Sequence, residues 1–126
     1  EHTSRGLGDV YKRQDRPVIT LHGDGGAMYT IQALWSQARE NLNITNIIFA
    51  NNSYEILKIE LSRVGAIKTG KRADSMLSLD NPPIDWMSLS KSMGVPCYEP
   101  KKVEDFIKIF SSAVKEPGPT TIIVKL

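Results

Sequence analysis

The sequence has very little cysteine: Cys97 is the single one among 126 residues, so an internal disulfide and a cysteine-based zinc site are both excluded. Cys97 follows Pro96 in an apolar stretch, and we interpret it as a small core residue. Long apolar runs are absent as well, since none approaches the roughly 18 residues needed to cross a bilayer. Residues 1–14 lack the apolar centre of a signal peptide. These absences predict a cytoplasmic protein with no membrane segment.

Charge of one sign is also missing, because Lys+Arg total 16 against Asp+Glu 14, for a net charge of +2. The basic residues form no stripe, and the aromatic residues, at 7%, are spread along the chain. We therefore expect no nucleic-acid partner. What is present, 40% hydrophobic and 24% charged residues, fits one globular domain with a core of its own.

The first fourteen residues differ from the rest, because they carry no hydrophobic period. Residues 9–14, DVYKRQ, resemble the translation of the transposase mosaic end that serves as an adapter in sequencing libraries. We interpret residues 1–14 as an adapter artefact, with an ordinary disordered polar tail as the alternative. The domain then spans residues 15–126, and we expect it to be a fragment of a longer protein.

Beyond residue 15, short apolar segments alternate with segments of helical period. The first strand is predicted at 17–22, and the flexible residues 23–26 stop it. A helix follows, with one apolar stripe that should pack on a sheet: Ile31, Leu34, Trp35, Ala38 and Leu42.

The later elements follow the same alternation. Strands are predicted at 45–50, 95–98 and 120–126, helices at 53–64, 86–93 and 103–114, and a loop at 65–84 with a turn near 75–79. Asp85 should cap the helix that starts at Trp86, and Gly94 should end it. The pattern predicts an α/β fold, a parallel sheet flanked by helices on both faces.

Unusual residues follow two of these strands, at 23–26 and at 51–53. Ligands of parallel sheets bind beyond the carboxyl ends of the strands, so we expect the two segments to be neighbours. Gly25 and Gly26 permit a close backbone approach, and the amide groups that open the next helix suit a phosphate. Asp24 would repel that phosphate unless a cation lay between them.

Magnesium resolves this conflict, because it takes six oxygen ligands and is commonly shared between a protein and substrate phosphates. Asp24 offers a carboxylate oxygen, Asn51 an amide oxygen and Ser53 a backbone carbonyl. The residues therefore favour a diphosphate bound through Mg²⁺.

The spacing of these residues resembles a known family motif. Gly23-Asp24-Gly25, then residues 26–50, then Asn51-Asn52 is similar to the cofactor motif of thiamine diphosphate enzymes. Residues 15–126 resemble the diphosphate-binding domain of the group that contains acetolactate synthase large subunits and benzoylformate decarboxylases. Two positions depart from the commoner pattern: Ala50 stands where many relatives have Asn, and Gly26 where many have Ser.

The resemblance implies a set of site residues. Asp24 and Asn51 would be magnesium ligands through their side chains, and Ser53 through its backbone carbonyl. The contacts to thiamine diphosphate would come from the glycine-rich turn and from the segment after the second strand: Gly23, Asp24, Gly25, Gly26, Ala27, Asn51, Ser53, Tyr54 and Leu57. Leu57 fits equally well as helix core.

The resemblance also implies an activity and partners. The complete enzyme would act on a 2-oxo acid such as pyruvate, and we expect an acetolactate synthase-like reaction that yields 2-acetolactate. The alternative is simple decarboxylation of the benzoylformate decarboxylase kind. Family members take an activating glutamate from the pyrimidine-binding domain of a second subunit, which implies a homodimer or homotetramer. We expect no catalytic residue in this fragment and no activity from it alone.

Other interpretations remain open at this point. Gly23-x-Gly25-x-x-Met28 partly matches a dinucleotide fingerprint, although Met28 stands where that fingerprint has glycine. Asp24 could be a plain helix cap and Asn51 a turn residue. A non-catalytic domain that binds a nucleotide or a partner is a further alternative. We interpret His22 as a strand-end residue rather than a base, and the 65–84 loop as a cover for the active site.

Overall fold

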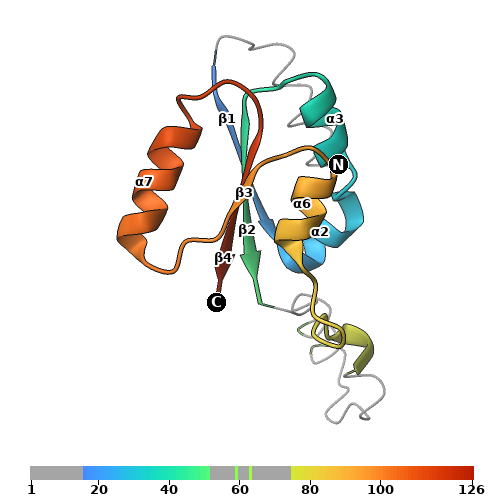
Figure 1. Ribbon diagram of the computed structural model, residues 1–126. Helices are drawn as coiled ribbons and strands as arrows, with labels where there is room; N and C mark the ends of the chain where they lie inside the picture. Colours follow the sequence, from blue (N-terminus) through green and yellow to red (C-terminus); the bar gives the residue numbers. More distant parts are fainter. Residues whose placement is uncertain (1–15, 52–58, 60–62, 64–74) are drawn as a thin grey trace.

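The computed structural model describes residues 16–51, 59, 63 and 75–126. Four parallel strands form one sheet in the order β1-β2-β4-β3, with helices on both faces (Figure 1). The predicted fold class is therefore confirmed. The strands are β1 (Val18–Gly23), β2 (Ile44–Ala50), β3 (Cys97–Tyr98) and β4 (Thr120–Lys125). The helices are α2 (Asp24–Thr30), α3 (Ala33–Arg39), α6 (Trp86–Ser92) and α7 (Val103–Ala113).

Strand β2 lies inside the sheet and is buried on both faces, as its continuous apolar sequence predicts. Strand β1 lies at one edge, and its residues alternate between half-buried and exposed. Ile19 is 47% exposed and Leu21 66% exposed, so one face of β1 is open to solvent. Figure 1 shows α7 on the opposite face of the sheet from α2, α3 and α6.

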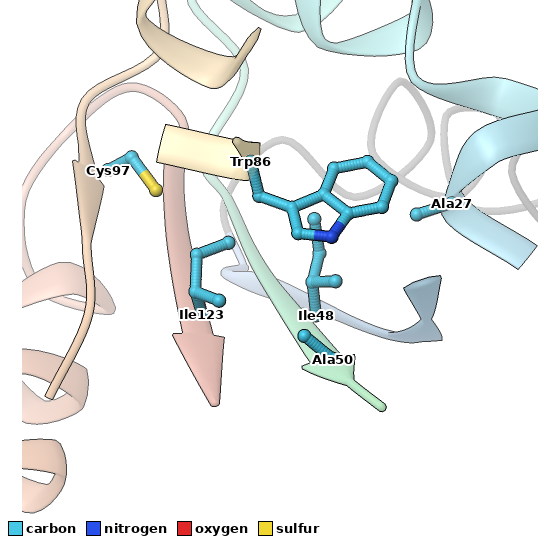
Figure 2. Close-up of a cluster of buried hydrophobic side chains, with 6 residues drawn as sticks. All are labelled: Ala27, Ile48, Ala50, Trp86, Cys97 and Ile123. Atoms are coloured by element: carbon cyan, nitrogen blue, oxygen red, sulfur yellow. The ribbon is translucent and has the colours of Figure 1, made fainter. Parts of the chain in front are cut away.

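The main hydrophobic core lies between the sheet and helices α2 and α6 (Figures 1 and 2). Its buried members come from both helices and from three of the strands: Ala27, Ile48, Ala50, Trp86, Cys97 and Ile123. Cys97 is 4% exposed, which confirms its interpretation as a core residue. Burial raises the pKa of its thiol to about 11, so the thiolate form is disfavoured there.

The segment after β1 differs from the prediction in two ways. Residues 24–26 are the first turn of helix α2, not a flexible stop, because helical backbone angles are open to glycine at a cost of only about 1 kcal/mol per residue. The predicted single helix is also divided, since Leu34 N–H donates to the Ile31 carbonyl in a tight turn between α2 and α3. Trp35, predicted to pack on the sheet, is 52% exposed, and the Arg39 guanidinium lies 5.4 Å from its ring centre.

Helix α6 agrees with the prediction at both ends. The Asp85 carboxylate accepts a hydrogen bond from Ser88 N–H at 3.1 Å, as an N-cap does. Gly94 follows the helix with a φ of 86°, a conformation that glycine adopts without strain. Of the helix predicted at 53–64, only residues 59 and 63 are described, and both are helical. Residues 65–74 of the predicted loop lie outside the described residues, and residues 75–77, where a turn was predicted, are helical.

Candidate functional site

The carboxyl ends of β1, β2 and β4 lie level with one another, because Gly23 pairs with Phe49 and Phe49 pairs with Val124. The chain leaves β1 at Asp24 and leaves β2 at Asn51. Two segments that are far apart in sequence therefore meet at one edge of the sheet. The prediction that the two strand ends are neighbours is confirmed by this register.

Asp24 is buried at this edge, with only 1% of its surface exposed. It is the first residue of α2, and one oxygen of its carboxylate accepts a hydrogen bond from Gly25 N–H at 3.0 Å. That bond fixes the direction of the carboxylate. A charged carboxylate is costly to bury, so a position of this kind favours a cation or further donors nearby.

The glycine-rich turn leaves open space beside Asp24. Gly26 is exposed, and a Cβ atom added there would meet no other atom within 4 Å. Gly25 and Ala27 are buried against the sheet. Open space at Gly26 next to a fixed carboxylate suits a phosphate group with its cation.

Asn51 is exposed at the end of β2 and can present its amide oxygen at the same edge. The other predicted contacts, Ser53, Tyr54 and Leu57, lie outside the described residues. Across residues 16–51 and 75–126, no three His, Cys, Asp or Glu side chains converge on one point. A metal ion at this edge would thus share its coordination with ligand oxygens, and the residues present fit a magnesium diphosphate.

A buried polar network fixes β2 behind this edge, and the sequence analysis did not foresee it. The Asn46 amide oxygen accepts from Thr20 Oγ1 at 2.8 Å and from Gln37 Nε2 at 3.2 Å. The Asn46 amide nitrogen donates to Gln37 Oε1 at 2.7 Å and to the Thr120 carbonyl at 3.3 Å. Asn46 therefore links three strands and α3, and these polar contacts hold the three strands in register.

His22 lies beside this network, on the last part of β1, and is half-buried. Burial lowers the pKa of its imidazole below the ordinary value of 6.5. Its surroundings, Gln37, Asn46 and apolar side chains of α2 and α3, agree with the interpretation of His22 as a strand-end residue.

Trp86 is the second feature that the sequence did not reveal. It lies in the core and is 4% exposed. Its indole N–H, however, has no hydrogen-bond partner, and it is the one buried side-chain donor or acceptor in that condition among the described residues. A tryptophan at a core position is a signal in itself, because its ring carries one donor that must be satisfied.

The chain matches the family model for the thiamine pyrophosphate enzyme, C-terminal TPP-binding domain, over residues 6–124. It belongs to that family. The match begins inside residues 1–14, and the origin of that segment stays a prediction.

Two proteins of similar sequence are named as an acetolactate synthase large subunit and as a pyruvate oxidase. The chain is 44% identical over 119 residues to IlvX of Mycobacterium tuberculosis, a protein named as an acetolactate synthase large subunit, covering 94% of this chain and 23% of that protein. It is 25% identical over 99 residues to pyruvate oxidase of Lactiplantibacillus plantarum, covering 79% of this chain and 15% of that protein. The chain therefore spans less than a quarter of the length of either relative.

Solved structures agree on the fold. The thiamine diphosphate-dependent 4-hydroxybenzoylformate decarboxylase of Rhodococcus jostii superimposes with a TM-score of 0.82 at 33% identity, over 95% of this chain and 21% of that one. The benzoylformate decarboxylase of Polynucleobacter necessarius superimposes with a TM-score of 0.81 at 22% identity, over 98% and 22% of the two chains. Among the described residues of this thiamine diphosphate-binding domain, no helix is long and apolar enough to cross a membrane.

Proposed function

We propose that this domain holds the diphosphate of thiamine diphosphate, through Mg²⁺, in a 2-oxo acid decarboxylase or carboligase of the acetolactate synthase kind. The observation that carries the proposal is the buried Asp24 carboxylate, fixed at the same sheet edge as Asn51 and next to the open backbone at Gly26. The family match, to a thiamine pyrophosphate-binding domain, supports thiamine diphosphate as the ligand.

Each candidate residue would have a different role in binding Mg²⁺ or the diphosphate. Asp24 supplies negative charge to the cation, Asn51 supplies a neutral amide oxygen, and Ser53 supplies a backbone carbonyl. Gly23, Gly25, Gly26 and Ala27 present backbone to the diphosphate, and Tyr54 and Leu57 would lie near the thiazolium ring. When bound, the cofactor supplies the carbon nucleophile that adds to a 2-oxo acid. This chain contributes position and charge neutralisation, which orient that nucleophile.

The reaction that we assign first is the conversion of pyruvate to 2-acetolactate, because the chain is 44% identical to IlvX. Decarboxylation of an aryl 2-oxo acid is the second candidate, supported by the 33% identity and TM-score of 0.82 to the Rhodococcus jostii enzyme. Either activity requires the activating glutamate of a pyrimidine-binding domain, from a second subunit of a dimer or tetramer. The complete enzyme, supplied with pyruvate and with benzoylformate in turn, would release acetolactate in the first case and benzaldehyde in the second.

The first test replaces Asp24 with Asn in the complete enzyme. Asp24→Asn keeps the shape of the side chain but removes its charge, so we expect the affinity for thiamine diphosphate in the presence of Mg²⁺ to fall about 100-fold, or about 2.7 kcal/mol. Calorimetric titration with the cofactor at fixed Mg²⁺ measures this loss.

The matched control is Asp105→Asn, the same change at an exposed carboxylate in the first turn of α7. It should leave cofactor affinity unchanged. Without Mg²⁺ and cofactor, the Asp24→Asn variant should unfold at an equal or higher urea concentration than the wild type, because a buried charge has been removed. Cofactor affinity within twofold of the wild type would contradict the proposed function.

A further inference from the structure

The indole N–H of Trp86 is a hydrogen-bond donor that the described protein leaves without an acceptor. The ring is 4% exposed, so bulk water does not reach the nitrogen either. Buried tryptophan nitrogens nearly always have a partner, from the protein or from a ligand or ordered water. An orphan donor of this kind therefore calls for an acceptor, such as a ligand oxygen or an ordered water.

The surroundings of the ring indicate where that acceptor lies. Trp86 packs in one cluster with Ala27 of α2 and with Ile48 and Ala50 of β2. Figure 2 shows the ring between Ala27 and the end of β2, with its nitrogen on the edge that faces along β2 toward Ala50. Ala50 immediately precedes Asn51, and Ala27 lies in the first turn of the helix that Asp24 begins. The donor thus lies beside both halves of the candidate site.

We propose that Trp86 is a positioning residue of the cofactor site, and that its indole N–H donates to an oxygen of the bound diphosphate, directly or through one ordered water. This inference rests on the proposed function, because the acceptor is part of the cofactor. An anionic oxygen is the strongest partner for a buried donor of this kind. The bond would tie helix α6 to the cofactor.

The first experiment observes the proton itself. The complete enzyme is labelled with ¹⁵N at the indole nitrogens, and the Trp86 signal is assigned by its disappearance in Trp86→Phe. We expect this signal to move downfield, and its exchange with solvent to slow, when thiamine diphosphate and Mg²⁺ are added. The signal of Trp35, whose ring is 52% exposed, should not move and is the internal control.

Inorganic diphosphate with Mg²⁺ is the second probe. If the acceptor is the diphosphate, this probe shifts the Trp86 signal in the same direction as the whole cofactor. If thiamine diphosphate shifts the Trp86 signal and inorganic diphosphate does not, the assignment of the acceptor to the diphosphate is overturned. A Trp86 proton that is already bonded before any ligand is added would show that the acceptor belongs to the protein, and would overturn the proposal altogether.

The second experiment measures affinity. Trp86→Phe keeps an aromatic ring in the core but removes the donor, so we expect the dissociation constant for thiamine diphosphate with Mg²⁺ to rise about tenfold, which is about 1.4 kcal/mol. The matched variant Trp35→Phe should bind as the wild type does.

The two proposals fail in different ways. If the wild-type enzyme does not bind thiamine diphosphate with Mg²⁺, the proposed function is wrong. If the wild type and Trp86→Phe bind it equally, the proposed function stands and the role of Trp86 is wrong. Should Trp86→Phe not fold, the wild-type spectrum still decides, because the proposal requires one buried indole proton to shift on binding.

Discussion

Burial of His22 gives the domain a pH dependence at the scale of one residue. Because burial lowers the pKa of His22, the folded state prefers the neutral imidazole more strongly than the unfolded state does. The contribution of His22 is therefore fully present above its ordinary pKa of 6.5 and is lost as the pH falls from that value through the folded pKa.

We predict that the free energy of unfolding of the 126-residue chain decreases between about pH 7.5 and about pH 5.5, and that His22→Gln removes most of this decrease. Urea unfolding at the two pH values measures both. The acidic groups Asp85 and Glu99, whose pKa values are lowered by the Ser88 and Lys101 hydrogen bonds, lose their contributions at lower pH, below their ordinary values of 3.8 and 4.5. A decrease of the same size in His22→Gln would assign the effect to another group.

At the scale of single elements, two glycines at helix ends behave in opposite ways. Gly26 lies inside α2, and a Cβ atom added there would face open space. Gly94 follows α6 with a φ of 86°, and a Cβ atom added there would lie 3.3 Å from the Ala38 side chain. We predict that Gly26→Ala raises the free energy of unfolding by about 0.5–1 kcal/mol and that Gly94→Ala lowers it by about 1 kcal/mol or more. Urea unfolding of both variants tests the two signs together.

The same two variants separate stability from binding. The space beside Gly26 is where the diphosphate is proposed to lie, so Gly26→Ala should weaken cofactor binding although it stabilises the helix. Gly94→Ala, away from the strand ends, should leave the affinity unchanged. If Gly26→Ala were both more stable and equally able to bind the cofactor, the close approach of the diphosphate to this backbone would be wrong.

Some features of the helices and strands could be predicted from the sequence and others could not. Helix α6 begins after Asp85 and ends before Gly94, as predicted, because capping depends on the residues next to the helix end. The division between α2 and α3 and the exposure of Trp35 were not predicted, because periodicity identifies a helical face but not what lies opposite it. The placement of Asp24 and Asn51 at neighbouring strand ends could be predicted from sequence, since each directly follows an apolar strand. The orphan donor of Trp86 could not, because it depends on the packing of several elements.

At the scale of the whole molecule, the parallel α/β architecture was predictable from the alternation of elements, but the strand order was not. The two-residue β3 pairs with β4 rather than with β2, and such pairings are decided by tertiary contacts. This order leaves β1 at an edge, with Ile19 and Leu21 exposed on one face.

An exposed apolar edge strand promotes association between chains. We predict that the 126-residue chain sediments as species that grow with concentration, and that Leu21→Lys, which places a charge on the open face of β1, reduces this growth. Leu126→Lys is the matched control, because Leu126 is also an exposed leucine, at 81%, but lies outside the strands. Equal association of the two variants in sedimentation velocity would show that the face of β1 is not the cause.

The register of β1 and β2 has one more consequence. It brings Asp24 and Asn51 together at the ends of a continuous segment that contains α2, α3 and β2. A magnesium diphosphate held between them would oppose the complete unfolding of this segment. A ligand that binds only the native state, present at 100 times its dissociation constant, adds about 2.7 kcal/mol to the free energy of unfolding. Thiamine diphosphate with Mg²⁺ would then slow proteolysis of the purified protein in step with the fraction of sites that it fills.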